Sequence, residues 1–177
     1  MCCVININDF RQDEKNVIPF GVHRESYTFE DMIFSKAGEY GIRAAVFIAS
    51  CSIGNERASL KDIAREIDSP EAFTAKILQL LVHAGIMDST RGPAGGFHCS
   101  TRQMKKTRLL DIVCAIDGAM SETHCVLGLK KCSEVNPCPV HHKFKQIKSD
   151  ILRMLSSTTL YEMSMSTADG LAFLKME

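Results

Sequence analysis

Three cysteines and a histidine lie close together in the C-terminal third of the chain. Cys125, Cys132 and Cys138 follow a C-x6-C-x5-C pattern, and His141 comes three residues after the last of them. Glycine, asparagine and proline between or beside the cysteines predict a loop, in which thiolates can converge on one point. Thiolate and imidazole groups bind iron and zinc. The spacing therefore indicates a metal-binding loop.

Three chemistries fit this loop. An iron–sulfur cluster would take the three thiolates and one ligand that is not a cysteine. Structural zinc would use the same Cys3His set, although zinc sites usually contain two cysteines separated by about two to four residues, and this segment has no such pair. A thiol switch would need no metal. Disulfides are a weaker interpretation of the eight cysteines, because we expect the chain to stay in a reducing compartment.

The region before the loop predicts a helix-turn-helix. Capping serines indicate helices that begin near Ser35, Ser59 and Ser69, the last with Pro70 at its first position. We expect the third helix to end before Gly85. Apolar spacing predicts that its buried face consists of Phe73, Ile77, Leu80, Leu81 and Ala84.

A turn rich in glycine and proline follows the third helix. Short strand-like pieces flank it within residues 86–99, which predicts a β-hairpin. A helix-turn-helix followed by a hairpin is typical of winged-helix DNA-binding domains, although such modules also bind proteins. On the third helix, the residues that we expect to face DNA are Ser69, Ala72, Thr74, Ala75, Lys76 and Gln79. Arg91 lies at the hairpin tip, where it can reach into a minor groove.

Composition and charge limit the other classes of function. The 177 residues are 45% hydrophobic and 24% charged, which is typical of a packed protein. The formal net charge is zero, but residues 1–31 hold three basic and six acidic side chains, whereas residues 32–110 hold eleven and seven. A nucleic-acid interface is therefore expected in the middle block. No apolar run is long enough to span a membrane, no secretory signal is recognisable, and no catalytic motif stands out. We expect a cytoplasmic protein that is not an enzyme.

The two ends of the chain differ in pattern. Residues 1–31 show no sustained periodicity, which predicts a disordered extension. An alternative is that translation starts at Met32, where the periodic pattern begins. After the hairpin, a helix is expected at about 108–117, closed by Gly118, and a long amphipathic helix at about 140–155.

Several of these segments together resemble the Rrf-type bacterial regulators. The resemblance rests on Met32–Arg43, the helix-turn-helix, the wing sequence Arg91–Phe97 and the cysteine loop with His141, and it covers residues 32–163. It implies a homodimer of winged helices that binds double-stranded operator DNA. It also implies an iron–sulfur cluster in each subunit that changes promoter binding in response to iron supply, oxidants or nitric oxide.

The resemblance also implies a ligand set. The three thiolate ligands would be Cys125, Cys132 and Cys138, holding a [2Fe–2S] or a [4Fe–4S] cluster. His141 matches the fourth ligand of some members. Other members use a carboxylate of the partner subunit near the start of the first helix, where this chain has Glu39; we favour His141 because it lies on the same local segment. Two departures are a first cysteine gap one residue longer than the commonest pattern, and Ala75 where some members carry a glutamate that changes promoter class.

The expected architecture is mainly α with a small β-hairpin wing, comprising a winged helix-turn-helix domain and a long dimerisation helix. We divide the chain into a disordered extension (1–31), the DNA-binding domain (32–100), a connecting helix (101–120), the cysteine loop (121–139), the dimerisation helix (140–163) and a flexible tail (164–177). The function expected from all these features is a repressor with an iron–sulfur sensor. The alternatives are a regulator with zinc or a thiol switch, and a protein-interaction module.

Overall fold

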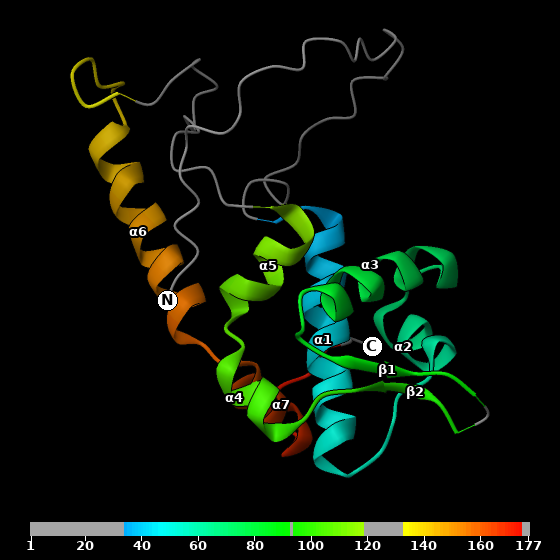
Figure 1. Ribbon diagram of the computed structural model, residues 1–177. Coiled ribbons are helices and arrows are strands. Elements are labelled where there is room, and N and C mark those ends of the chain that lie inside the picture. Colours follow the sequence, from blue (N-terminus) through cyan, green and yellow to red (C-terminus); the bar gives the residue numbers. More distant parts are fainter. Residues whose placement is uncertain (1–33, 93, 119–132, 175–177) are drawn as a thin grey trace, which may run out of the picture.

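The computed structural model describes residues 34–92, 94–118 and 133–174 (Figure 1). In chain order the elements are α1 (Lys36–Ile53), α2 (Leu60–Ile67), α3 (Glu71–His83), β1 (Asp88–Thr90), β2 (Gly96–His98), α4 (Thr101–Lys106), α5 (Leu109–Asp117), α6 (His141–Ser157) and α7 (Leu160–Ala168). This mainly helical architecture with one antiparallel hairpin confirms the predicted fold class. The extension predicted for residues 1–31 lies outside the described residues.

Side-chain caps start the first two helices where the sequence predicts them. The hydroxyl of Ser35 accepts a hydrogen bond from the backbone N–H of Gly38 at 3.0 Å, and that of Ser59 accepts one from Asp62 at 3.2 Å. The cap predicted at Ser69 is wrong. Asp68 closes α2 in the left-handed conformation with φ of 54°, so α3 begins one residue later than predicted, with Pro70 at its N-cap and no side-chain cap.

Helix α1 forms the centre of the core and contacts α2, α3, α5 and α7. Its buried side chains include Ala44 and Ile48, which are fully inaccessible to solvent. At Gly41 an added Cβ would collide with the side chain of Ile116 on α5 and lie 3.3 Å from Cγ2 of Ile77 on α3. Small residues on α1 therefore let α3 and α5 approach the same stretch of backbone.

The buried face of α3 differs from the predicted one. Phe73 and Leu80 are 38% and 44% exposed, and Ala84 is exposed as well. The buried residues are Thr74, Ile77, Leu78 and Leu81, which recur at the spacing of one helix face. The helix is thus rotated about its axis relative to the prediction. A threonine is tolerated inside because its hydroxyl donates to the carbonyl of Pro70 at 3.1 Å.

The wing is a short antiparallel hairpin that is fixed to the rest of the domain. Ser89 pairs with Phe97 at the centre of its register. Phe97 also exchanges two backbone hydrogen bonds with Ala58, of 2.9 and 3.1 Å, which adds the segment between α1 and α2 to the edge of the hairpin. Gly96 has φ of 145°, and a Cβ there would lie 2.8 Å from the carbonyl oxygen of Ala58. The glycine therefore permits this close pairing.

The C-terminal half corrects two predicted boundaries. Residues 101–120 contain two helices, α4 and α5, in place of one connecting helix. The predicted dimerisation unit 140–163 is divided into α6 and α7, and α7 continues into the predicted tail 164–177. Helix α7 packs against α1, where Ser164 is buried and its carbonyl accepts a hydrogen bond from Ser50 at 3.2 Å. Along the described segments, no helix has the length and apolarity needed to cross a membrane.

Candidate nucleic-acid interface and metal centre

The outer face of α3 carries part of the predicted DNA-reading set. Ala72, Lys76 and Gln79 are exposed and follow one another at the spacing of a single helix face. Ala75 lies between them and is half-buried. An amide and an ammonium group on this face can pair with base edges and phosphates in a major groove. Contact of these four residues with DNA therefore stays a proposal.

Two residues of the predicted set do not face outward. Thr74 is fully buried, because the rotation of α3 turns it toward the core. Ser69 is half-buried, and its hydroxyl oxygen is buried without a hydrogen-bond partner in the described structure. Base reading by Thr74 is therefore excluded in this conformation, and Ser69 can contribute only through its backbone.

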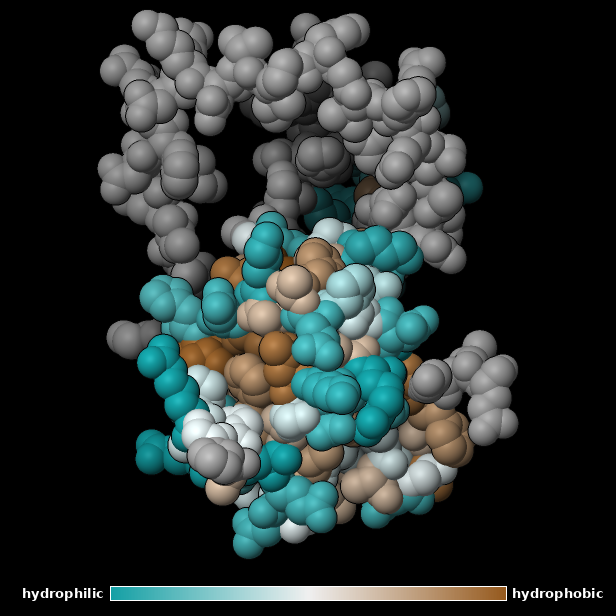
Figure 2. Space-filling model, turned by 90° about the vertical axis from the view of Figure 1, so that its right-hand side faces the viewer, coloured by the Kyte–Doolittle hydropathy of each residue, from teal (hydrophilic) through white to brown (hydrophobic). Residues whose placement is uncertain are grey.

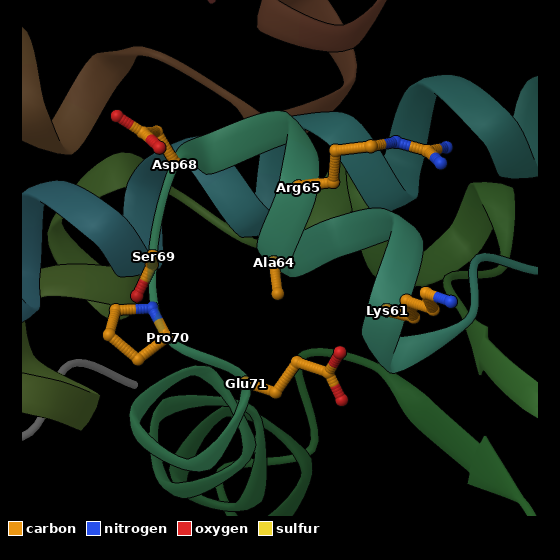
Figure 3. Close-up of a pocket in the computed structure, with 7 residues that line it drawn as sticks. All are labelled: Lys61, Ala64, Arg65, Asp68, Ser69, Pro70 and Glu71. Atoms are coloured by element: carbon orange, nitrogen blue, oxygen red, sulfur yellow. The ribbon is translucent and has the colours of Figure 1, made fainter.

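A shallow hollow separates α2 from the start of α3 (Figure 3). Its lining consists of Lys61, Ala64, Arg65, Asp68, Ser69, Pro70 and Glu71. In the close-up the Ala64 methyl points into the hollow from α2, and the Glu71 carboxylate lies on the opposite side. The two cations and two carboxylates of the lining cancel, and Arg65 is already paired with Asp62 at 2.7 Å. The turn of the helix-turn-helix therefore adds no net positive charge.

The wing presents Arg91 to solvent directly after β1. Gly92 follows with φ of 111°, a conformation that favours glycine and turns the chain at the tip. Arg57 is hydrogen-bonded to the hairpin, because its guanidinium donates to the hydroxyl of Thr90 at 3.1 Å. Figure 2 shows this side of the molecule, on which hydrophilic and apolar residues are interspersed. Arg91 is thus exposed directly after a strand whose last residue is hydrogen-bonded to Arg57.

Two predicted metal ligands meet at the start of α6. The carbonyl oxygen of Cys138 accepts a hydrogen bond from the backbone N–H of His141 at 3.0 Å, which closes a turn directly before α6. Cys138 is half-buried and His141 is 6% exposed. Cys125 and Cys132 lie outside the described residues. Within the part of the chain that the structure describes, no three or more metal-binding side chains gather at one point.

The segment before Cys138 is tied to α6. The hydroxyl of Ser133 accepts hydrogen bonds from the backbone N–H groups of Val135 and Asn136, at 3.2 and 3.3 Å. The carboxylate of Glu134 pairs with the ammonium group of Lys145, which holds the pKa of Glu134 below its usual value. These contacts shape the chain where it approaches the two ligands.

The alternative ligand Glu39 lies elsewhere. It occupies the first turn of α1, where it is half-buried and forms an ion pair with Lys36 at 3.0 Å. In Figure 1 the start of α1 lies beside α5, apart from the start of α6. One subunit therefore does not bring Glu39 to Cys138, and only a partner subunit could supply it.

Three further cysteines have different surroundings. Cys99 is 1% exposed, and burial raises the pKa of its thiol to about 12. Burial and the nearby Glu56 carboxylate raise the pKa of Cys51. Cys114 is half-buried on α5. Because the thiolate is the reactive form, Cys99 and Cys51 are poor candidates for a thiol switch.

Sequence reasoning missed a contact between distant residues. The carboxylate of Asp117, at the end of α5, accepts hydrogen bonds from the backbone N–H of Ser35 at 3.1 Å and from its hydroxyl. Gly118 and the cysteine segment follow Asp117 in the sequence. These hydrogen bonds therefore connect the start of α1 to the end of the helix that precedes the cysteine segment. The two residues are 82 positions apart, so no local pattern signals the contact.

Comparisons with known proteins agree with this arrangement. The family model Rrf2, described as an iron-dependent transcriptional regulator, matches residues 34–165. An HTH-type transcriptional regulator of Aquifex aeolicus is 33% identical over 135 residues, which cover 75% of this chain and 91% of that protein. The HTH-type transcriptional regulator IscR of Vibrio campbellii is 25% identical over 132 residues, covering 75% and 77%.

A solved structure has the same fold. CymR, the global cysteine regulator of B. subtilis, matches with a TM-score of 0.62 at 23% identity, covering 75% of this chain and 95% of that one. The family match runs from α1 through the helix-turn-helix and the wing into α7. The related proteins are transcriptional regulators and not enzymes. The chain therefore belongs to the Rrf2 family of DNA-binding transcriptional regulators, as the resemblance in its sequence predicts.

Proposed function

We propose that this chain is a dimeric, cytoplasmic repressor that senses iron supply, redox state or nitric oxide through an iron–sulfur cluster in each subunit. The observation that carries the proposal is the backbone hydrogen bond between Cys138 and His141, which places both residues in the turn that leads into α6. Both belong to a chain whose family is described as iron-dependent.

The donor set fits a cluster. Cys125, Cys132 and Cys138 would supply thiolates, and His141 would supply a nitrogen ligand. A bound cluster would supply a centre that reacts with oxidants and nitric oxide and depends on iron supply. Because His141 is almost fully buried, water has little access to its ring, and α6 begins at this residue.

Dimerisation through α6 is supported by its exposed apolar side chains. Ile147 and Met154 are 52% and 45% exposed and share one helix face with half-buried Ile151. In Figure 1 most of α6 projects from the body of the molecule. A second copy that crosses α6 would cover this stripe. The ligands at the start of α6 would then lie next to the subunit interface, so a change in ligation could alter the spacing of the two wings.

The competing functions share the fold but differ in chemistry. A zinc-stabilised regulator would use the same four side chains. A thiol switch would have to use cysteines other than Cys51 and Cys99, because the pKa of each is raised. A protein-interaction module would show no salt-dependent binding of DNA.

The proposal is tested on protein purified without oxygen, by its visible spectrum together with iron, zinc and acid-labile sulfide analysis. We expect a brown protein with broad absorbance near roughly 400 nm and with labile sulfide. Cys138→Ala should be pale, whereas Cys51→Ala should keep the colour. His141→Ala should change the spectrum, while the neighbouring exposed His142→Ala should not.

The remaining outcomes separate the alternatives. A colourless protein with stoichiometric zinc would assign the loop to structural metal. A protein that stays colourless and metal-free after reconstitution with iron and sulfide would leave the thiol switch. A spectrum that changes in Glu39→Gln but not in His141→Ala would assign the fourth ligand to the partner subunit.

A further inference from the structure

Positive charge is unevenly distributed over the DNA-binding region. Residues 32–99, which include the helix-turn-helix and the wing, contain seven basic and seven acidic side chains. Residues 100–110 contain four basic side chains and no acidic ones. The whole basic excess of the block therefore comes from Arg102, Lys105, Lys106 and Arg108, which follow the wing. We call these four residues the α4 basic surface.

The fold directs these cations outward. Helix α4 begins shortly after β2 ends, at the base of the wing (Figure 1). A capping box fixes its start, because the side-chain oxygen of Gln103 accepts a hydrogen bond from the backbone N–H of Ser100 at 2.8 Å. Met104 is 1% exposed and anchors the inner face of the helix. The basic residues on either side of Met104 are consequently exposed.

Two members of the surface are held by neighbouring groups. The ammonium group of Lys105 lies 5.0 Å from the centroid of the Tyr161 ring, and the guanidinium of Arg108 donates to the carbonyl of Ser157 at 3.0 Å. Arg102 and Lys106 have no carboxylate within 4.0 Å among the residues that the structure describes.

The neighbouring carboxylates are already engaged. Glu162 on α7 feels the charge of Arg108, but its side chain accepts the backbone N–H of Thr159 at 2.8 Å. Asp111 on α5 accepts the backbone N–H of Arg108 at 2.7 Å. Lys105 and Arg108 of the α4 basic surface thus have fixed contacts, and the charge of the surface is only partly neutralised within the subunit.

We propose that the α4 basic surface is a second contact for the phosphate backbone of duplex DNA, beside the wing and outside the helix-turn-helix. The inference rests on the DNA binding of the family. Unpaired surface cations release the counterions of DNA when they bind it, and this release drives binding that is independent of sequence. Because the charges of residues 32–99 cancel, α4 supplies the attraction, while Lys76, Gln79 and Arg91 supply base and groove contacts.

The test compares two double variants that remove the same charge. Arg102→Gln/Lys106→Gln removes two of the four cations of the α4 basic surface, and Lys143→Gln/Arg153→Gln removes two exposed cations of α6. Binding of the full chain to a mixed-sequence duplex of about 40 base pairs is measured by fluorescence anisotropy at several salt concentrations. For each subunit that contacts the duplex, we expect the α4 variant to lower the slope of log K against log salt by about 1.8 and to weaken binding about 30-fold near ~0.15 M salt. The α6 variant should stay within about twofold of the wild type.

Charge-preserving variants and the wild type complete the experiment. Arg102→Lys/Lys106→Arg should keep the wild-type slope, which separates the effect of charge from an effect on folding. If the wild type shows no salt-dependent binding, DNA binding itself fails. If the wild type binds and the α4 double variant has the same slope and affinity, only the present inference is wrong. Weaker binding with an unchanged slope would show that α4 affects binding without contacting phosphates and would also overturn the inference.

Discussion

Replacing Thr74 by valine removes one buried hydroxyl from α3 and leaves the shape of the side chain almost unchanged. Thr74 is fully buried, and its hydroxyl donates to the carbonyl of Pro70 at 3.1 Å. The same carbonyl accepts the backbone N–H groups of Phe73 and Thr74, at 3.0 and 2.9 Å. It keeps these two partners in the variant, so no buried polar group is left unsatisfied.

The size of the effect follows from these contacts. A hydrogen bond contributes about 0.5–1.5 kcal/mol to stability, so Thr74→Val should lower the free energy of unfolding by about 1 kcal/mol. Thr74→Ala also removes a buried methyl group, which is worth about 0.8 kcal/mol in transfer alone, and leaves a small cavity. We expect a loss of about 2 kcal/mol in the alanine variant. Thr74→Ser keeps the hydroxyl, loses the methyl group and should lie between these values.

The assay pairs urea denaturation with binding of operator DNA, at one fixed protein concentration because the protein is proposed to dimerise. Thr74→Val should bind DNA within about twofold of the wild type, since the residue does not reach the surface. Gln79→Leu is the matched control. Its side chain is exposed, so it should weaken DNA binding about tenfold and change stability by less than about 0.5 kcal/mol.

The opposite pattern would refute this orientation of α3. If Thr74→Val had wild-type stability and bound operator DNA about tenfold more weakly, its hydroxyl would have to face a base edge. The rotation of α3 inferred from Phe73 and Leu80 would then be wrong. Equal effects of Thr74→Val and Gln79→Leu on DNA binding would contradict it as well.

Three further outcomes are expected. Arg91→Ala should weaken operator binding about tenfold and leave the urea midpoint unchanged; equal affinity would show that the wing tip does not contact DNA. Cys99 ionises near 9.0 when unfolded and at about 12 when folded. Raising the pH above about 9 therefore deprotonates Cys99 in the unfolded chain first and stabilises that state. In urea denaturation, the free energy of unfolding of the wild type should fall by about 1.4 kcal/mol per pH unit relative to that of Cys99→Ala. Asp117→Ala removes both acceptors of Ser35, so it should cost about 1 kcal/mol and speed amide exchange at the start of α1, whereas exchange at wild-type rates would contradict this role.

Features that depend on a few neighbouring residues could be predicted from the sequence. The caps at Ser35 and Ser59 each need only a hydroxyl and a backbone N–H three residues away. The hairpin follows from glycines that permit unusual backbone angles, such as Gly96. The adjacency of Cys138 and His141 follows from their spacing at a helix start. Local geometry decides each of these features, so the surrounding fold changes them little.

The orientation of α3 could not be predicted in the same way. Both faces contain Ile77 and Leu81, and the predicted one is the more apolar in sequence because it holds Phe73 and Leu80 where the observed one holds Thr74 and Leu78. Because the two faces share Ile77 and Leu81, the buried face turns by less than the ~100° between successive residues. Tertiary packing makes the choice, because the core buries Thr74 and Leu78 completely and leaves Phe73 and Leu80 exposed. Periodicity alone carries no information about the shape of the helix against which α3 packs.

The same limit applies to the path from the cysteine segment to the DNA-binding face. Ser35 and Asp117 are far apart in sequence, yet their hydrogen bonds join the start of α1 to the end of α5. From there α1 reaches α3 at the contact between Gly41 and Ile77. A displacement of the chain after Asp117 would therefore act on the same helix that supports the DNA-reading face of α3. Coupling between two sites requires that both bias one shared element, and α1 contacts both α5, which precedes the cysteine segment, and α3.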